Sequence, residues 1–293
     1  MRLPGPFPIA FAAVLALGGL VRAADAADGP SAELGLALEK IAIDNKIPGM
    51  AAVVLHGDTI AASAVAGLRR LGTSEPITLE NRFHLGSNTK SMTATLAALF
   101  VEEEKLSWST TLGRIFDTPV ELMHEGWKDV TLQQLLAHRS GLPANFDPAL
   151  REKLRASQLS LPEQRKMIVA ETLRRAPDYA PGSKYVYSNL GFVFVGAILE
   201  QISEQPWETL LAERLFAPLG IKSGGFGPPG TRGGTDQPWG HNEAGRPVQG
   251  DNPAAMGPAG TVHMAIGDWA KYVSLHLRGD PRNPHHAPKM LKP

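Results

Sequence analysis

The first hydrophobic pattern in the chain has the period of a helix. Leucine and isoleucine side chains recur three or four residues apart over residues 31–46, which predicts an amphipathic helix. Ser31 or Asp28 is the expected cap of its first turn, and Ile47-Pro48-Gly49 ends it.

Two short runs of apolar and β-branched residues follow, at residues 50–55 and 59–65. The segment His56-Gly57-Asp58 between them contains a Gly-Asp pair, which is typical of a tight hairpin turn. A helix followed by a hairpin forms one fragment of an α/β layer, and it cannot bury both of its faces alone.

From Ser87 onward the hydrophobic period is mostly helical. The first of these helices begins at Ser87, buries the stripe Met92, Leu96, Leu99 and Phe100, and ends in a charged turn at residues 102–105. Thr131-Leu132-Gln133-Gln134 has the T-x-x-Q pattern of a capping box before a short helix, which His138-Arg139-Ser140-Gly141-Leu142-Pro143 closes with Gly and Pro.

The same rules predict the remaining elements. Further helices are expected at residues 161–175, 190–202, 206–216 and 261–277. Pro181-Gly182-Ser183 is a predicted turn, and residues 224–260, rich in Gly and Pro, are a predicted irregular connection.

Composition narrows the class of protein without choosing a function. The 293 residues are 43% hydrophobic and 20% charged, which suits one large domain or two closely packed ones. Lys plus Arg and Asp plus Glu number 29 each, so no basic field indicates a nucleic acid partner. Because the chain has no cysteine, it can form no disulfide and carry no lipid on a thiol.

Residues 1–26 have the pattern of a secretory signal peptide. Arg2 supplies a positive start, residues 9–21 are apolar, and Ala24-Asp25-Ala26 fits an A-x-A cleavage site. The apolar run is short for a bilayer span, and the alternative is an uncleaved membrane anchor. We expect a periplasmic or secreted protein with no stable membrane span after cleavage.

Ser87 and Lys90 form the first candidate catalytic pair. Positions i and i+3 share one face of a helix, so the Lys90 amine can lie beside the Ser87 hydroxyl and take its proton. The alternative is that Ser87 caps the helix through its side chain while Lys90 is solvated.

Tyr187-Ser188-Asn189 forms the second candidate motif, Y-x-N. A tyrosine phenol can relay a proton, and an asparagine amide can hold a substrate amide by donor and acceptor together. The alternative is a tyrosine packed in a loop and an asparagine that caps the helix beginning at Leu190.

The two motifs, in this order and 100 residues apart (187 − 87), resemble the serine β-lactamase and penicillin-binding protein superfamily. The resemblance is closest to the branch of class C β-lactamases, D-Ala-D-Ala carboxypeptidases and esterases. It extends over residues 31–280 through four further stretches: Leu135-Leu136-Ala137-His138-Arg139-Ser140-Gly141-Leu142, the Pro181-Gly182 turn, Pro218-Leu219-Gly220-Ile221, and Gly257-Pro258-Ala259-Gly260 before Asp268.

This resemblance implies an α/β (α+β) fold of the β-lactamase/transpeptidase type. An antiparallel sheet flanked by helices would contain residues 31–86, and a mostly α-helical part would contain residues 87–280 of a hydrolase domain at residues 27–293. Residues 281–293 are expected to be a disordered tail, because they are rich in Pro, Asn, His and Lys.

The resemblance also implies a role for each motif residue. Ser87 would be the acylated nucleophile and Lys90 its base or electrostatic partner. Tyr187 would protonate the leaving group and then activate water, while Asn189 would bind the acyl-side amide. The Ser87 backbone N–H at a helix N-terminus would supply half of an oxyanion hole. No metal or cofactor is expected, since the nine histidines show no metal-ligand spacing and His285-His286 falls in the tail.

The pattern departs from the family in a third box, Lys or His followed by Thr or Ser and Gly. Lys222-Ser223-Gly224 matches these letters but follows Pro218-Leu219-Gly220, in the helical half, so we interpret it as a chance match, like Arg139-Ser140-Gly141. The true box belongs after Asp268, beyond the last residue. We therefore expect an incomplete member that lacks C-terminal sheet strands. Its hairpin would expose an apolar face and lower solubility, and the absence of the third box puts the activity of this chain in question.

Three functional interpretations stay open at this point. The first is a serine hydrolase acting on a small molecule or peptide with a reactive carbonyl: a β-lactam, a D-Ala-D-Ala peptide or an ester. The second is a non-catalytic protein of the same fold that binds peptidoglycan peptides. The third is a secreted structural domain in which both motifs are accidental.

Overall fold

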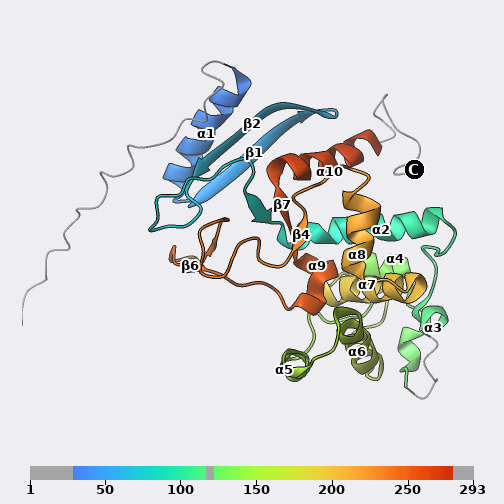
Figure 1. The fold of residues 1–293 in the computed structure, drawn as a ribbon. Helices are drawn as coiled ribbons and strands as arrows, with labels where there is room; N and C mark the ends of the chain where they lie inside the picture. Colours follow the sequence, from blue (N-terminus) through green and yellow to red (C-terminus); the bar gives the residue numbers. More distant parts are fainter. Residues whose placement is uncertain (1–28, 117–121, 280–293) are drawn as a thin grey trace, which may run out of the picture.

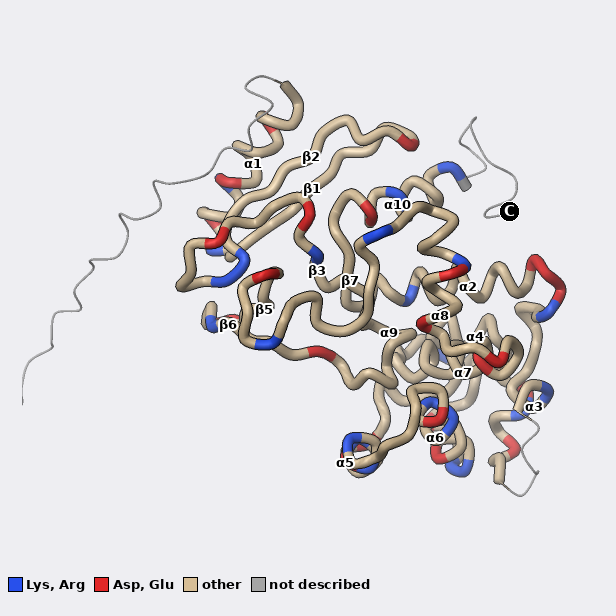
Figure 2. The backbone as a smooth tube through the Cα atoms, viewed as in Figure 1, with Lys and Arg blue, Asp and Glu red and all other residues tan. Residues whose placement is uncertain are grey.

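The computed structural model describes residues 29–116 and 122–279 (Figure 1). The predicted signal peptide and the predicted C-terminal tail lie outside these residues. The described part mixes antiparallel sheets with many helices, which confirms the expected fold class. Figure 2 shows acidic and basic residues interspersed along the backbone, including α5 and α6, as the balanced charge predicts.

The chain begins with a helix packed on a two-stranded hairpin. Helix α1 (Pro30–Asp44) lies against β1 (Gly49–His56) and β2 (Thr59–Gly67), which pair antiparallel with a bulge after Val54. Helix and hairpin are confirmed, although both strands are longer than predicted. Gly67 lies at φ +87, and a Cβ there would lie 2.2 Å from the Pro48 carbonyl oxygen, so this end of the hairpin requires glycine.

The predicted cap of α1 is wrong. Gly29 occupies the cap position, and no side chain makes a capping hydrogen bond. The Ser31 hydroxyl instead accepts a hydrogen bond from the Ser63 backbone N–H of β2 at 3.2 Å, so it joins the helix to the sheet.

A second sheet has the strand order β3-β7-β4, with β3 at Arg82–His84, β7 at Val262–Ala265 and β4 at Gly225–Phe226. The predicted helix over residues 261–277 is wrong at its start, because Val262–Ala265 form the buried middle strand of this sheet. Helix α10 (Ile266–Gly279) begins only afterwards.

The remaining elements are short helices and turns around one long buried helix. They are a 3-10 turn at Gly86–Asn88, α2 (Thr89–Glu102), α3 (Leu112–Ile115), a 3-10 turn at Glu125–Trp127, α4 (Leu132–Leu136), α5 (Pro148–Ala156), α6 (Leu161–Leu173), α7 (Asn189–Ser203), α8 (Trp207–Leu211), a π-helical turn at Ala212–Phe216, a 3-10 turn at Ala254–Met256 and α9 (Gly257–Gly260). The irregular connection before α9 also contains a two-residue strand pair, β5 (Gly240–His241) with β6 (Pro247–Val248).

Several local predictions in this region are confirmed. Thr131 and Gln134 form the reciprocal capping box of α4, with N···O distances of 3.2 and 3.0 Å. The expected helix over residues 206–216 is corrected to α8 followed by the π-helical turn. Helix α4 ends earlier than its Gly and Pro suggested, because His138 itself takes the left-handed conformation, at φ +57.

Helix α7 is the centre of the largest core. Eleven successive residues from Leu190 to Glu200 are buried, and α2, α4, α6 and α9 pack around it. A helix buried on all sides is apolar on all sides, which explains why its hydrophobic run is nearly continuous. The one charged member of that run, Glu200, is bound by the fully buried Arg165 of α6.

Candidate active site

Ser87 lies where the small sheet passes into the helical region. Strand β3 ends at His84, the Leu85 N–H donates to the Val262 carbonyl of β7 at 2.8 Å, and Gly86 turns the chain at φ +52. Ser87 is the middle residue of the 3-10 turn that leads directly into α2. The turn requires the left-handed backbone that glycine adopts without strain, so Gly86 fixes where the serine emerges.

Lys90 lies one turn further on and reaches back to the serine. Its Nζ donates to Ser87 Oγ at 3.1 Å, to Asn189 Oδ1 at 2.7 Å and to the Ala259 carbonyl oxygen at 2.7 Å. The side chain is buried, with 6% of the residue exposed. Burial lowers the pKa of Lys90 from its ordinary value, because desolvation penalises the charged form.

Tyr187 reaches the same oxygen atom. Its hydroxyl donates to Ser87 Oγ at 2.7 Å, and Lys90 Nζ lies 4.9 Å from the centre of its ring. Burial favours a higher pKa for the phenol, but hydrogen bonding with Lys90 and Ser87 and the charge of Lys90 outweigh it, so the pKa of Tyr187 is lowered.

Asn189 is the first residue of α7, and it does not cap that helix. Ser188 is the cap: its hydroxyl accepts from the Gly191 N–H at 3.1 Å and donates to the Pro143 carbonyl oxygen at 2.6 Å. The Asn189 amide is therefore available for Lys90 on its oxygen and for Asn145 Oδ1, at 2.8 Å, on its nitrogen.

The structure thus brings all four predicted site residues together, and we call Ser87, Lys90, Tyr187 and Asn189 the Ser87 cluster. The alternative of a capping serine fails, because Ser87 Oγ accepts from Lys90 and Tyr187 and α2 has Asn88 at its cap position. A hydroxyl oxygen between an amine and a phenol is an arrangement suited to nucleophilic catalysis.

Two neighbours of the cluster were not predicted. Asn145 holds the amide nitrogen of Asn189, and the His138 ring stacks on Tyr187 with ring centres 4.6 Å apart. Both lie in loops without a hydrophobic period. His138 is part of the segment predicted to close α4, but no pattern in the sequence indicates its contact with Tyr187 or that of Asn145 with Asn189.

The segment Lys222-Ser223-Gly224 has a structural use away from the cluster. The Ser223 hydroxyl donates to Asp268 Oδ2 at 2.6 Å and accepts from the Ala265 N–H at 2.9 Å, next to the start of α10. Burial opposes ionisation of Asp268, but bonds from Lys271, Ser223 and two backbone N–H groups outweigh it and lower its pKa to about 2. This placement agrees with the interpretation of the segment as a chance match.

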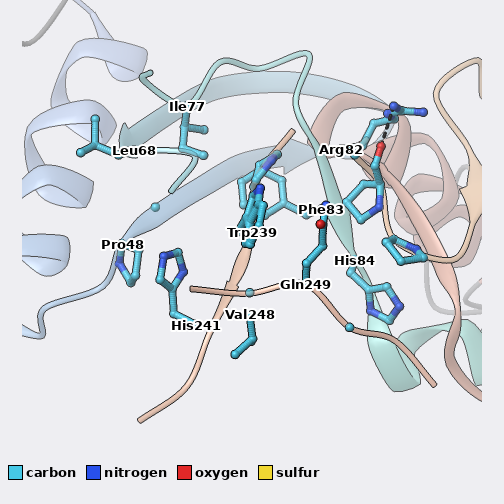
Figure 3. A pocket seen from close by; sticks show the side chains of 17 residues that line it. Pro48, Leu68, Ile77, Arg82, Phe83, His84, Trp239, His241, Val248 and Gln249 are labelled. Atoms are coloured by element: carbon cyan, nitrogen blue, oxygen red, sulfur yellow. Dashed lines mark hydrogen bonds between the residues drawn. The ribbon is translucent and has the colours of Figure 1, made fainter. Parts of the chain in front are cut away.

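A pocket of about 410 Å³ lies beside β3, between that strand and the connection that carries β5 and β6 (Figure 3). Phe83 and His84 of β3 line it, together with Trp239 and Gln249 of that connection. The Ser87 cluster does not line it. A second pocket, of about 250 Å³, includes Asn145 in its wall and so adjoins the cluster on the Asn189 side.

Two further properties concern the described residues as a whole. Within residues 29–116 and 122–279, no group of three or more His, Asp or Glu side chains is arranged to hold a metal ion. Every helix in this part of the chain is too short or too polar to span a bilayer.

Comparison with known proteins gives a consistent result. A family model described as Beta-lactamase matches residues 22–292. The chain is 26% identical to penicillin-binding protein 4 of Amycolatopsis lactamdurans over 249 residues (80% of this chain, 60% of the relative). It is 29% identical to a putative D-alanyl-D-alanine carboxypeptidase of Escherichia coli over 200 residues (64% of this chain, 45% of the relative).

Solved structures agree on the fold. The crystal structure of the D-alanine carboxypeptidase AmpC from Burkholderia cenocepacia has a TM-score of 0.68 at 23% identity, with 87% of this chain and 66% of that chain covered. The chain spans less than two thirds of the length of the curated relatives it matches, and under half of several of them.

Proposed function

The chain belongs to the Beta-lactamase family, and from this premise we propose that it is a serine hydrolase that forms an acyl-enzyme on Ser87. The observation that carries the proposal is the convergence of Lys90 Nζ and the Tyr187 hydroxyl on Ser87 Oγ, at 3.1 and 2.7 Å. Family members and carboxypeptidase-named relatives support hydrolase chemistry at this site.

Lys90 is the proposed base for the first step. Asn189 Oδ1 and the Ala259 carbonyl oxygen each accept one N–H of Lys90. A neutral amine keeps both bonds and directs its lone pair at Ser87 Oγ, so it can take the hydroxyl proton as Oγ attacks the carbonyl carbon. The lowered pKa of Lys90 makes that neutral form more accessible near neutral pH.

Tyr187 is the proposed proton relay for the second half of the reaction. Its hydroxyl is hydrogen-bonded to Ser87 Oγ and its ring lies beside Lys90 Nζ. Tyr187 can therefore pass the proton taken by Lys90 to the leaving group. The bond from the carbonyl carbon to the leaving group breaks, and the acyl group stays on Oγ. In deacylation Tyr187 accepts a proton from the attacking water as it returns its own proton to Lys90. The bond between the acyl carbon and Oγ then breaks, and this proton passes back to Ser87 Oγ, which restores the hydroxyl and the neutral amine.

Asn189 and the Ser87 backbone N–H are the proposed binding groups. An amide held by Lys90 on its oxygen and by Asn145 on its nitrogen has a fixed orientation, which suits recognition of a substrate amide. The Ser87 N–H opens a helix and can donate to the oxygen on which negative charge develops.

The proposed substrates are peptides or esters with a carbonyl centre, including D-Ala-D-Ala peptides and β-lactams. Relatives named for D-alanyl-D-alanine carboxypeptidase activity support the peptide class. Among these classes we favour a general ester or peptide hydrolase over a dedicated β-lactamase.

A burst experiment tests the proposal. The full chain and its Ser87→Ala variant are mixed with excess p-nitrophenyl ester, with nitrocefin and with a D-Ala-D-Ala peptide, and product is followed from the first turnover. Acyl-enzyme formation predicts a burst of up to one product per protein molecule with at least one substrate, and none with Ser87→Ala. Saturable peptide binding without any burst would favour the non-catalytic, peptide-binding interpretation.

We also propose that the protein acts in the periplasm or outside the cell. The support is the signal-like pattern of residues 1–26 and the similarity to penicillin-binding proteins. Fractionation of cells that express the full chain with a C-terminal tag tests this, and a tag retained in the cytoplasm would contradict it.

A further inference from the structure

We propose that His138 is a positioning residue that holds the Tyr187 phenol on Ser87 through one ring stack and two hydrogen bonds. The imidazole lies nearly parallel to the Tyr187 ring, with centres 4.6 Å apart and planes at 30°. Within the described residues the hydrogen bonds of Ser87 Oγ are with Lys90 and Tyr187 and those of His138 are with the loop around Tyr187, so His138 acts through the tyrosine. The inference rests on the proposed function of the Ser87 cluster.

The two hydrogen bonds hold both sequence neighbours of Tyr187. The Val186 N–H donates to the His138 carbonyl oxygen at 2.9 Å, and the Ser188 N–H donates to His138 Nδ1 at 3.0 Å. A single residue therefore fixes the backbone before and after the tyrosine and packs on its ring. Three contacts at successive positions leave the phenol little freedom to leave the serine.

The backbone of His138 makes this arrangement possible. At φ +57 it ends α4 in the left-handed region, which costs free energy in any residue other than glycine and is tolerated best by asparagine. A left-handed glycine would end the helix with less strain but has no ring to stack and no Nδ1 to accept. The site retains a histidine where the backbone alone would favour glycine.

Only the neutral imidazole fits these contacts. Because Nδ1 accepts a hydrogen bond, the ring proton must be on Nε2. Burial and then the charge of Lys90 lower the pKa of His138 below its ordinary value of 6.5. The groups that face the ring are Lys90 of α2, Phe192 of α7, and Tyr185 and Tyr187 of the preceding loop, and Lys90 is the charged one among them.

Two variants separate the stack from the hydrogen bond. His138→Asn keeps an acceptor near the position of Nδ1 and tolerates the left-handed backbone, but it has no ring. His138→Phe keeps a ring and has no acceptor. His276→Asn is the matched control. His276 also packs on a tyrosine ring, with its ring centre 4.7 Å from that of Tyr272, but both of these residues are on α10, outside the Ser87 cluster.

The first measurement is acylation of Ser87 by a p-nitrophenyl ester under single-turnover conditions. Displacing a proton-relay group by about 1 Å can cost up to about a hundredfold in rate, so at least one His138 variant should acylate about ten- to a hundredfold more slowly. Affinity for the reagent should change little, and His276→Asn should match the unaltered protein.

The second measurement does not depend on activity. The chain contains four tyrosines, so ring-carbon NMR with labelled tyrosine can follow Tyr187, assigned through Tyr187→Phe. In the unaltered protein the Tyr187 phenol should titrate below 10, and its signal should also shift at the pH, below 6.5, where His138 is protonated. In His138→Asn the second shift should disappear, and the phenol should titrate closer to 10.

The outcomes separate this inference from the proposed function. If the unaltered protein is not acylated, the proposed function fails, while the tyrosine titration still tests the positioning role. The inference is overturned if His138 titrates without any change in the Tyr187 signal, or if both His138 variants acylate at the unaltered rate. Slowing in only one variant supports the inference and identifies which contact positions the phenol.

Discussion

The helical region and the N-terminal layer of this protein are packed very differently. In the helical region one continuous cluster of buried side chains extends from Met92 to Leu275, with α7 at its centre. In the layer of α1, β1 and β2, the buried cluster consists of Leu38, Ala42, Ala64 and Ala66. Leu36 and Ile43 of α1 are each 69% exposed.

The difference in packing corresponds to the position of the candidate active site. Ser87 is in the 3-10 turn that leads into α2, Lys90 is on α2, Tyr187 is in the loop that leads to α7 and Asn189 is on α7, so none of the Ser87 cluster is on β1 or β2. A nucleophile, a base and a relay must be held within a fraction of an ångström, which requires neighbours that cannot repack. The helical core supplies such neighbours, and the thin layer can tolerate more change without altering the site.

The largest expected effect is on the chemistry itself. Lys90→Met should slow acylation of Ser87 by about a thousandfold, within the range of 10²–10⁴ for loss of a general base, without loss of the fold. In the unaltered protein the rate should rise with pH through the lowered pKa of Lys90, because only the neutral amine can take the proton. Stopped-flow labelling across pH measures both, and a variant with an unaltered rate would exclude Lys90 as the base.

The next effect concerns the buried ion network of the helical region. Arg165 is fully buried; its Nε donates to Glu200 Oε2 at 3.0 Å and its Nη2 to Glu208 Oε2 at 2.8 Å, so it links α6, α7 and α8. Arg165→Met leaves two carboxylates uncompensated and should cost about 3–5 kcal/mol in the free energy of unfolding.

The matched change in the N-terminal layer is Lys40→Met, which removes the exposed pair with Asp44. It should change stability by less than about 1 kcal/mol. Urea unfolding compares the two variants, and equal costs would contradict the difference in packing.

The next prediction compares the loss of stability caused by the same substitution, leucine to alanine, in the two cores. Leu96→Ala, at a site with 0% exposure in the helical core, should cost about 4 kcal/mol, near the top of the range for buried leucines. Leu38→Ala, at 5% exposure in the thin layer, should cost about 2 kcal/mol, because its surroundings can collapse into the space. Calorimetric or urea unfolding would refute the comparison if Leu38→Ala were the more damaging.

The last expected effect concerns the junction of β7 and α10. Asp268→Asn should cost about 2 kcal/mol, since the ionised carboxylate accepts bonds from Lys222, Ser223 and Lys271. Its folded pKa of about 2 is below the ordinary 3.8, so this contribution is present above about pH 4 and is lost as the pH falls toward 2. Urea unfolding measured between pH 2 and 5 should show that the free energy of unfolding falls less with acid in the variant than in the unaltered protein.

Local patterns in the sequence predicted much of this structure. The β1–β2 hairpin, the Thr131 capping box and helix α7 depend on residues close together in the chain, so their signals are short-range. Strand β7 was predicted as helix, because its identity depends on pairing with β3, which is far away in the sequence.

The residues of the candidate site also divide into those whose contacts could be predicted from local spacing and those whose contacts depend on the fold. Ser87 and Lys90 are one helical turn apart, and their contact could be predicted from spacing. Tyr187 joins them only through the fold: the Y-x-N motif marked it as a candidate, but only the family resemblance implied that it acts with Ser87. His138 and Asn145 were missed, because stacking on a ring or holding an amide leaves no periodic mark in the sequence.

The central claim, that Ser87 is the nucleophile, is tested most directly by locating a covalent adduct. The full chain is incubated with a labelled penicillin and with a fluorophosphonate, then digested with trypsin, which cuts after Arg82 and Lys90 and releases residues 83–90 with Ser87 inside. We predict that mass spectrometry finds the label on Ser87 in this peptide, and no label in Ser87→Ala. Label on another residue, or equal labelling of Ser87→Ala, would contradict the account.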